Sequence, residues 1–217
     1  MILEKMGEFF DRRLDGYEAH QLGEIDSAHE FYPYTASLLP RDDRACVLDL
    51  GCGTGLELDF YFKLNPTACI TGIDLAHDML TRLREKHGGK SLELIEDSYF
   101  DVPFGESRFD AAVSVESLHH FTYAEKLPLY CKLRRALRDG GYFVLTDYLC
   151  DTNEQESYFR CELNRLKCEQ GIEDNEFYHY DTPLTVAHEI EALTMAGFSD
   201  VKLISEWGST RTIVAYV

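Results

Sequence analysis

The sequence predicts one α/β domain whose central sheet is mostly parallel and is covered by helices on both faces. Three observations support this prediction. Short apolar segments alternate with helical patterns, a glycine-rich turn follows the first of these segments, and the final two apolar segments lie too close together for a crossover helix. A chain of 217 residues is long enough for one sizeable core.

The expected parallel strands are short runs rich in Val, Ile and Leu, bounded by glycine, aspartate or asparagine. Buried parallel strands have this continuous apolar character. The five runs cover residues 45–50, 69–73, 92–95, 110–115 and 141–146. Helical patterns separate several of them, at residues 55–64, His77–His87 and 124–137.

Other segments flank this alternation. Residues 1–44 read as a helical lead-in, with one helix over 2–14 and a second over 27–39. Residues 150–182 interrupt the rhythm after the fifth strand and contain an expected helix over Asn153–Gln170. After a helix over 185–196, the runs at 200–207 and 211–217 are expected to form an antiparallel hairpin at a mixed sheet edge.

The net charge and the cysteine pattern make some classes of partner and some locations less expected than others. The formal net charge is -18, with 39 acidic and 21 basic side chains. A chain this acidic is repelled by phosphate backbones and anionic membrane surfaces, so nucleic-acid and membrane partners are disfavoured. The start of the sequence is charged and lacks the apolar core of a signal peptide, and the seven cysteines form no CxxC pair. We therefore expect a cytoplasmic protein without a membrane span.

The strongest motif is the glycine-rich turn after the first expected strand. It reads VLDLGCGTG, with Gly51, Gly53 and Gly55 spaced as GxGxG instead of the GxGxxG of dinucleotide-binding proteins. Glycines allow a tight turn and the close approach of a ligand. Asp49 precedes them inside the strand end, where a carboxylate suits an amino or sulfonium group better than a pyrophosphate. A tight turn without a ligand is the alternative reading.

Acidic residues also follow the next two expected strands. Asp74 lies 23 positions after Gly51, close to the offset at which a carboxylate meets the ribose of an adenosine ligand. Asp97 follows the third strand, where it can accept a hydrogen bond from an adenine amino group. The alternatives are a helix N-cap for Asp74 and an exposed loop residue for Asp97.

Five segments in order then resemble class I methyltransferases: DLGCGTG, GIDLAHDML, EDSYFDVPF, FDAAVSVESLHHF and LRDGGYFVLTDY. The resemblance covers about residues 46–148, and the AGF sequence at 196–198 with the final hairpin also fits. It implies a Rossmann-like fold with a seven-stranded sheet in the order 3-2-1-4-5-7-6, strand 7 being antiparallel. It also implies S-adenosyl-L-methionine as the cofactor.

The resemblance implies a cofactor site as well. Some residues of this site would contact the methionine end, the ribose or the adenine of S-adenosylmethionine. The others would lie next to these contacts, in the glycine loop or in the N-terminal lid. The site residues are Asp49, Gly51, Cys52, Gly53, Gly55, Asp74, Leu75, Met79, Asp97, Ser98, Glu116 and Tyr17. Tyr17 is included because FDRRLDGYE is similar to the N-terminal lid of small-molecule methyltransferases.

Methyl transfer needs a general base only when the nucleophile must lose a proton. Candidates lie at the ends of the fourth and fifth strands: His119, His120 and Asp147 are the proposed catalytic residues. Histidine titrates near neutral pH and suits this role. Alternatively, the His-His pair packs against the sheet or serves the cofactor pocket. No metal site is expected, because no histidine has a second His or Cys at ligand spacing on one helix face.

The expected organisation is a single domain over residues 1–217. It comprises a helical lid (1–44), a cofactor-binding core (45–149), an insertion that shapes the acceptor site (150–182), and a C-terminal helix and hairpin (183–217). The predicted function is methyl transfer to an O, N or S atom of a small molecule. The alternatives are a non-catalytic module that binds S-adenosylmethionine or S-adenosylhomocysteine, and a nicotinamide (NAD)-dependent oxidoreductase, which the GxGxG spacing and Asp49 disfavour.

Overall fold

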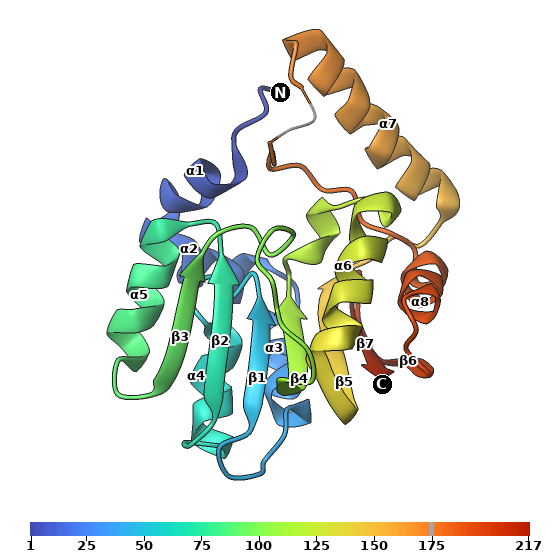
Figure 1. The fold of residues 1–217 in the computed structure, drawn as a ribbon. Helices are drawn as coiled ribbons and strands as arrows, with labels where there is room; N and C mark the ends of the chain where they lie inside the picture. The colour runs from blue at the N-terminus through green and yellow to red at the C-terminus, as the bar shows by residue number, and fades with distance from the viewer. Residues whose placement is uncertain (174–175) are drawn as a thin grey trace.

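The computed structural model describes residues 1–173 and 176–217, and these residues form one seven-stranded sheet flanked by helices (Figure 1). The strand order is β3-β2-β1-β4-β5-β7-β6. Neighbouring strands pair in parallel, except that β7 runs antiparallel to both β5 and β6. The predicted fold class, strand order and terminal hairpin are confirmed. The expected 150–182 insertion includes residues 174–175, which lie outside the described residues.

The strands lie where the apolar runs predict them, and those in the middle of the sheet are almost fully buried. Their bounds are β1 Cys46–Leu50, β2 Cys69–Asp74, β3 Ser91–Glu96, β4 Phe109–Val115, β5 Leu137–Tyr148, β6 Asp200–Trp207 and β7 Thr210–Tyr216. The edge strand β6 alternates exposed and half-buried residues, as a strand with one solvated face does.

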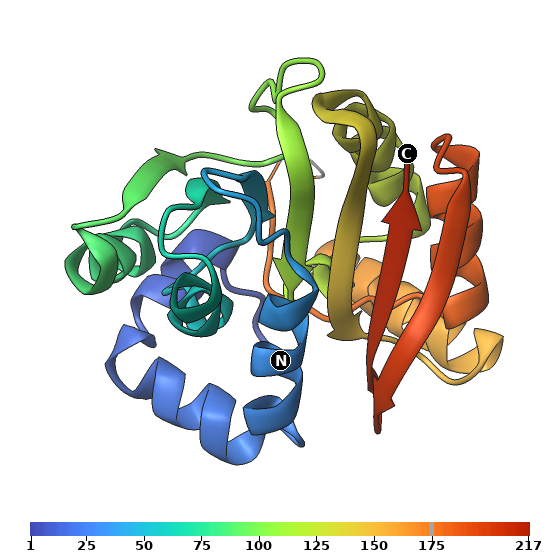
Figure 2. The same cartoon turned by 90° about the horizontal axis from the view of Figure 1, so that it is seen from below.

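Helices cover both faces of the sheet. Their bounds are α1 Met6–Asp11, α2 Leu14–Glu24, α3 Ala28–Leu38, α4 Leu56–Leu64, α5 His77–His87, α6 Tyr123–Ala136, α7 Asn153–Gln170 and α8 Val186–Met195, with a short 3-10 helix η1 at Leu118–His120. Helices α3, α4 and α5 lie on one face, and α6 and α8 on the other (Figures 1 and 2). Each face has its own buried apolar cluster, so the core has two layers.

The N-terminal lead-in differs from the expected single helix over 2–14. It forms α1 and then α2, and a kink interrupts α2 near its start at Asp15, whose ψ is 110°, and Gly16, whose φ is +92°. Glycine adopts this left-handed conformation at little cost, and a helix cannot continue through it. The helical turns after Gly16 were not expected, because the segment DGYEAHQLGE has no clear apolar face.

The N-terminal segment is attached to the insertion. The Met6 amide donates to the Phe177 carbonyl at 2.9 Å, and the His179 amide donates to the Glu4 carbonyl at 2.9 Å. Leu3 also packs with Leu163 of α7 in a small apolar cluster. Both segments lie beyond the carboxyl ends of β1, β2 and β4 (Figure 1). The two parts of the chain predicted to cover the site are therefore joined to each other.

Two further observations concern the environment of the protein. Among the described residues, no helix combines the length and the apolar character needed to cross a membrane. All seven cysteines fall within the described ranges, and each is a free thiol.

Candidate active site

The glycine loop has the geometry that the sequence predicts. Gly51, Gly53 and Gly55 have φ angles of +73°, +48° and +72°, which residues with a Cβ rarely adopt. A Cβ at Gly51 would lie 2.0 Å from Ser117 Oγ, and one at Gly55 would lie 2.5 Å from a methyl group of Leu83. The loop therefore requires glycine for its conformation and for the close approach of neighbouring residues.

Asp74 connects the end of β2 to this loop. Its Oδ2 accepts a hydrogen bond from the Gly53 amide at 2.8 Å, and its Oδ1 accepts one from the Ala76 amide at 2.9 Å. The N-cap position of α5 is Ala76 and not Asp74. The carboxylate therefore fixes the end of the glycine loop against the turn before α5, at the edge of a pocket.

That pocket is narrow, with a cavity volume of about 50 Å³. Seven of the predicted cofactor-site residues line it: Tyr17, Gly51, Gly53, Asp74, Leu75, Met79 and Glu116. The other lining residues are Met6, Phe10, Tyr99, Ser117 and His120. Ligand pockets commonly measure about 300–1,000 Å³, so this pocket is smaller than a usual ligand site. Met6 and Phe10 of α1 and Tyr17 of α2 form part of its wall.

Asp49 lies beneath the loop and does not line the pocket. It is 1% exposed, and its Oδ2 is buried with no hydrogen-bond partner among the described residues. Burial, together with the neighbouring Glu57 carboxylate, raises the pKa of Asp49 well above its usual value. Glu57 Oε1 is likewise buried without a partner. The loop therefore covers the carboxyl groups of Asp49 and Glu57, and few donors or cations lie near enough to stabilise their charged forms.

The remaining predicted cofactor residues lie around the pocket and not on its wall. Cys52 is buried beneath the loop, and burial raises the pKa of its thiol, which makes it a poor nucleophile. Asp97 is exposed and accepts the Ser98 amide through Oδ1 at 2.7 Å. Ser98 is buried, and its Oγ accepts the Phe100 amide at 3.1 Å. A role of Asp97 and Ser98 in reading adenine stays a prediction.

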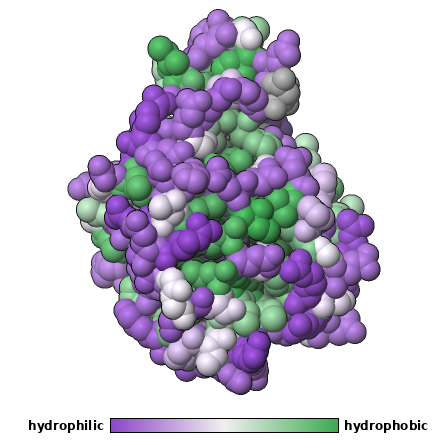
Figure 3. Space-filling view, turned by 60° about the vertical axis from the view of Figure 1, so that its left-hand side comes forward, coloured by the Kyte–Doolittle hydropathy of each residue, from purple (hydrophilic) through white to green (hydrophobic). Residues whose placement is uncertain are grey.

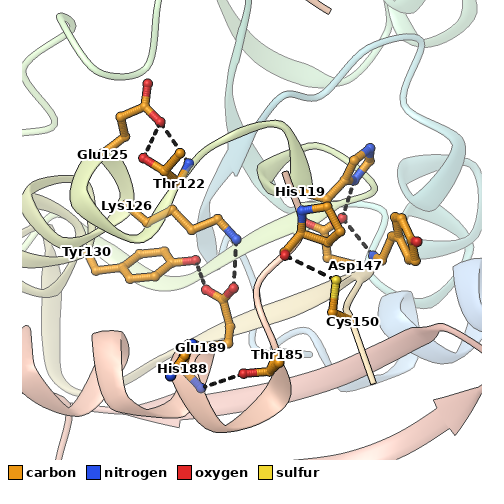
Figure 4. Close-up of polar contacts among 12 residues, drawn as sticks. His119, Thr122, Glu125, Lys126, Tyr130, Asp147, Cys150, Thr185, His188 and Glu189 are labelled. Atoms are coloured by element: carbon orange, nitrogen blue, oxygen red, sulfur yellow. Dashed lines mark hydrogen bonds and ion pairs between the residues drawn. The ribbon is translucent and has the colours of Figure 1, made fainter. Parts of the chain in front are cut away.

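His119 and Asp147 form a buried pair at the ends of η1 and β5 (Figure 4). His119 Nδ1 lies 2.5 Å from Asp147 Oδ1, and that oxygen also accepts the Tyr148 amide at 2.9 Å. Burial alone would lower the pKa of His119, but the Asp147 carboxylate outweighs it and raises this pKa to about 9. In the absence of other ligands His119 is therefore cationic at neutral pH.

His120 and Glu116 lie beside this pair. Burial and the neighbouring His119 lower the pKa of His120, so His120 is neutral at pH 7. Burial and the Asp147 charge raise the pKa of Glu116 to about 7. Glu116 has a φ of +50°, an uncommon conformation for a residue with a Cβ, and its Oε1 accepts the Thr210 hydroxyl at 2.9 Å. The predicted catalytic residues His119, His120 and Asp147 thus meet in space.

Asp181 of the insertion completes this cluster, and sequence reasoning missed it. Its Oδ1 lies 3.1 Å from His120 Nδ1 and 3.6 Å from His119 Nε2. Burial raises the pKa of Asp181, but the hydrogen bond from His120 and the charge of His119 lower it below its usual value. No spacing rule connects residue 181 with residues 119 and 120; only the path of the insertion over the sheet brings them together.

A second, larger cavity of about 860 Å³ opens beside the cluster. Its aromatic wall comes from the N-terminal segment, the end of β5 and the end of β6: Phe9, Phe10, Tyr17, Tyr148 and Trp207. Carboxylates and histidines supply the polar lining, including Asp26, Glu116, Asp181, His20 and His179. Apolar residues gather in the middle of the side that carries α1 and α5, bordered by hydrophilic ones (Figure 3). The large cavity and the narrow pocket share Phe10, Tyr17, Glu116 and His120.

Comparisons with known proteins agree with this arrangement. A family model described as a methyltransferase domain matches residues 47–141. A fatty-acid O-methyltransferase of Mycolicibacterium smegmatis is 36% identical over 101 residues, covering 46% of this chain and 36% of that protein. A sterol 24-C-methyltransferase of Gibberella zeae is 27% identical over 199 residues, covering 88% of this chain and 46% of that protein.

Solved structures share the fold. Human N-acetylserotonin methyltransferase in complex with S-adenosylmethionine superposes with a TM-score of 0.63 at 18% identity, over 88% of this chain and 52% of that one. The chain spans between about a third and a half of the length of the two curated relatives named above. The match to a methyltransferase domain, the sheet order and the glycine loop all agree with the resemblance of this chain to class I S-adenosylmethionine-dependent methyltransferases.

Proposed function

We propose that this protein transfers the methyl group of S-adenosylmethionine to an O, N or S atom of a small molecule bound in the large cavity. One observation carries the proposal: the narrow pocket at the glycine loop and the 860 Å³ cavity share four residues. A cofactor in the first and an acceptor in the second would meet beside Glu116 and His120.

The residues around the narrow pocket fit this cofactor. It carries an ammonium group and a sulfonium charge, and the buried Asp49 Oδ2 has no hydrogen-bond partner among the described residues. Asp74 offers a carboxylate at the pocket edge, while Leu75 and Met79 offer apolar surface. When bound, the cofactor supplies a methyl group on a good leaving group, so the protein needs mainly to align the acceptor and exclude water. Such alignment contributes about 7–11 kcal/mol in favourable cases.

The cluster of His119, His120, Asp147, Glu116 and Asp181 handles the proton of the acceptor. Asp147 holds the His119 ring through Nδ1, so that Nε2 faces Asp181. His120 lies at the junction of the two cavities. We assign His119, His120 and Asp147 to catalysis, as the sequence predicts.

The lead-in (residues 1–44) and the insertion (residues 150–182) select the acceptor. The lead-in contributes aromatic side chains to the cavity wall, and the insertion contributes His179 and Asp181. Hydrogen bonds between Met6 and Phe177 and between His179 and Glu4 join the two segments. The relatives act on a fatty acid and a sterol, as their names state. We infer a small organic acceptor with an apolar body, because aromatic rings form much of the wall.

The binding partners and the cell compartment that we propose rest on the net charge of the protein and on its free cysteines. A net charge of -18 opposes binding of nucleic acids and anionic membranes, so we propose that neither is a partner. Seven free cysteines suit a reducing compartment, and we propose the cytoplasm.

The proposal is tested by calorimetric titration of the purified protein with S-adenosylhomocysteine. We expect saturable binding that the Asp74→Ala variant weakens and the exposed Asp78→Ala variant leaves unchanged. Incubation with S-adenosylmethionine and a panel of small alcohols, amines, thiols and carboxylic acids should then give a methylated product. Binding of NAD without binding of S-adenosylhomocysteine would refute the proposal, and cofactor binding without any product would favour a non-catalytic module.

A further inference from the structure

Three side chains from two distant parts of the chain present ligand atoms to one point. One ligand atom from each of His119, His120 and Asp181 lies within 4.8 Å of the other two. His120 Nδ1 is 3.1 Å from Asp181 Oδ1, and His119 Nε2 is 3.6 Å from the same oxygen. The Tyr180 carbonyl oxygen lies a further 3.3 Å from His120 Nδ1.

These separations match those around a metal ion. Nitrogen and oxygen ligands of zinc lie about 2.0–2.2 Å from the ion, so two ligands of a tetrahedral site are about 3.3 Å apart. The two separations measured from Asp181 Oδ1 lie on either side of this value. Two histidines and one carboxylate also form the donor set that divalent transition metals such as Zn²⁺, Co²⁺ and Fe²⁺ favour.

A second layer of contacts already orients one of these ligands. His119 Nδ1 is paired with Asp147 Oδ1 at 2.5 Å, and Asp147 is fully buried. Metal-bound histidines usually donate their other ring N–H to such a carboxylate, which fixes the tautomer and the ring orientation. His119 is therefore held with Nε2 turned toward the three-atom site, the orientation that a metal ligand requires.

The surroundings hold more carboxyl groups than positive charges. Asp147 Oδ2 is buried and has no hydrogen-bond partner among the described residues. Glu116 and Asp147 together with His119 form a second group of ligand atoms within 4.8 Å of one another. Three carboxylates thus surround two histidines in a partly dry site. A divalent cation compensates this charge better than a single proton does.

The site is also accessible. His119, His120 and Asp181 all line the 860 Å³ cavity, so a metal ion there would keep coordination positions open toward a bound small molecule. Catalytic metal sites share this arrangement of three protein ligands and an open position.

We propose that His119, His120 and Asp181 bind a divalent transition-metal cation that holds the reacting heteroatom of the acceptor. The metal site itself stands on the geometry of the three side chains, and only its role toward the acceptor rests on the proposed function. The cation would take the place of the proton at His119 Nε2, while neutral His120 would carry its ring proton on Nε2 so that Nδ1 is free to bind. The cation would act as a Lewis acid on the acceptor.

The test measures metal binding directly. Untagged protein is stripped with a chelator and titrated with Co²⁺, whose visible absorption reports coordination by histidine and carboxylate, and with Zn²⁺ by calorimetry. We expect one ion per chain. The His120→Gln and Asp181→Asn variants should each bind at least about tenfold more weakly. Asp147→Asn, which changes only the outer layer, should weaken binding about 10–100-fold.

Two controls make the result specific. His179→Gln changes a histidine in the same cavity whose ring centre lies 4.9 Å from that of His120, and it should leave Co²⁺ affinity unchanged. Circular dichroism of each variant checks that the fold is intact. Absence of Co²⁺ binding to the wild type, or binding that Asp181→Asn and His120→Gln do not weaken, would overturn the proposal.

The two proposals fail in different ways. S-adenosylhomocysteine binding without metal binding refutes the metal site and leaves methyl transfer standing, with the histidines acting on the proton directly. Metal binding without S-adenosylhomocysteine binding refutes the cofactor assignment and leaves the metal site standing.

Discussion

At the scale of single residues, Gly51 shows how a missing side chain shapes the site. Its φ of +73° and the short distance from its virtual Cβ to Ser117 Oγ leave no space for alanine. We expect Gly51→Ala to lower the free energy of unfolding by about 1–3 kcal/mol and to abolish S-adenosylhomocysteine binding. Urea denaturation and calorimetry measure the two effects.

Gly89→Ala is the matched control for this substitution. A Cβ at Gly89 would meet nothing within 4 Å, and its φ is not positive. It should change neither stability nor binding by a measurable amount. A Gly51→Ala protein that binds the ligand as the wild type does would show that the loop can rearrange without loss of function.

Asp49 is expected to stabilise the bound cofactor while destabilising the ligand-free fold. Its folded-state pKa is raised above the unfolded value, so its contribution to stability is present at low pH and is lost as the pH rises through the folded pKa. We therefore expect Asp49→Asn to raise the Tm of the ligand-free protein at pH 7 and to weaken S-adenosylhomocysteine binding.

Thermal unfolding between pH 4 and pH 8 measures this effect. The Tm advantage of Asp49→Asn should grow as the pH increases, whereas the exposed Asp139→Asn should show no such trend. An Asp49→Asn protein that is less stable than the wild type at pH 7 would mean that the carboxylate is compensated in the ligand-free state.

At the scale of elements, a buried ion pair connects α6 and α8. Lys126 Nζ lies 2.6 Å from Glu189 Oε2, both side chains are 0% exposed, and the Tyr130 hydroxyl donates to the other Glu189 oxygen (Figure 4). Removing one partner leaves an uncompensated buried charge. We expect Glu189→Leu to lower the free energy of unfolding by about 3–5 kcal/mol in urea denaturation.

The double variant Lys126→Met with Glu189→Leu removes both charges and should recover part of that loss, because a pair of apolar residues of similar volume can replace a buried pair. The surface pair Lys202 and Asp200 offers a contrast, since breaking an exposed ion pair costs about 0–1 kcal/mol. Equal losses for the single and the double variant would show that packing, and not charge, connects the helices.

The strands and most helices could be predicted from sequence because local pattern and tertiary role agree. The segments that end in Leu50, Asp74 and Val115 are buried on both faces, so their apolar runs are unambiguous. The helix over Asn153–Gln170 has a capping box at Thr152 and a left-handed Gly171 at its end, both local signals. The predicted bounds of α5 and α7 agree with the structure.

The parts of the site that sequence did not predict depend on distant contacts. Asp181 joins His119 and His120 only because the insertion returns over the sheet edge, where the Thr182 amide donates to the His119 carbonyl at 2.7 Å. Ser117 reaches the glycine loop from β4, and Tyr99 meets Ser117 with an O···O distance of 3.3 Å. Spacing rules describe ligands on one helix face, so they could not indicate a cluster built from a strand end, a 3-10 helix and a loop.

At the scale of the whole molecule, we propose that the lead-in acts as a lid, because its side chains line both cavities. Deletion of residues 1–26 removes Phe10 and Tyr17, which line both of them. We expect turnover to fall at least about tenfold and cofactor affinity to change, as measured by product formation and calorimetry. Ile2→Ser, at a position 83% exposed, is the control and should have no effect. A truncated protein with intact turnover and affinity would refute the lid.

The hydrogen bonds between residues 4–6 and residues 177–179 have a kinetic consequence. Since the two covering segments are joined, we expect them to move together, so that one opening motion uncovers both ligands. Under the proposed function, both products then leave through one opening event, and the next pair of substrates enters before the following closure. Steady-state turnover is therefore bounded by the rate of that opening, and a solvent-viscosity dependence of kcat would be its signature.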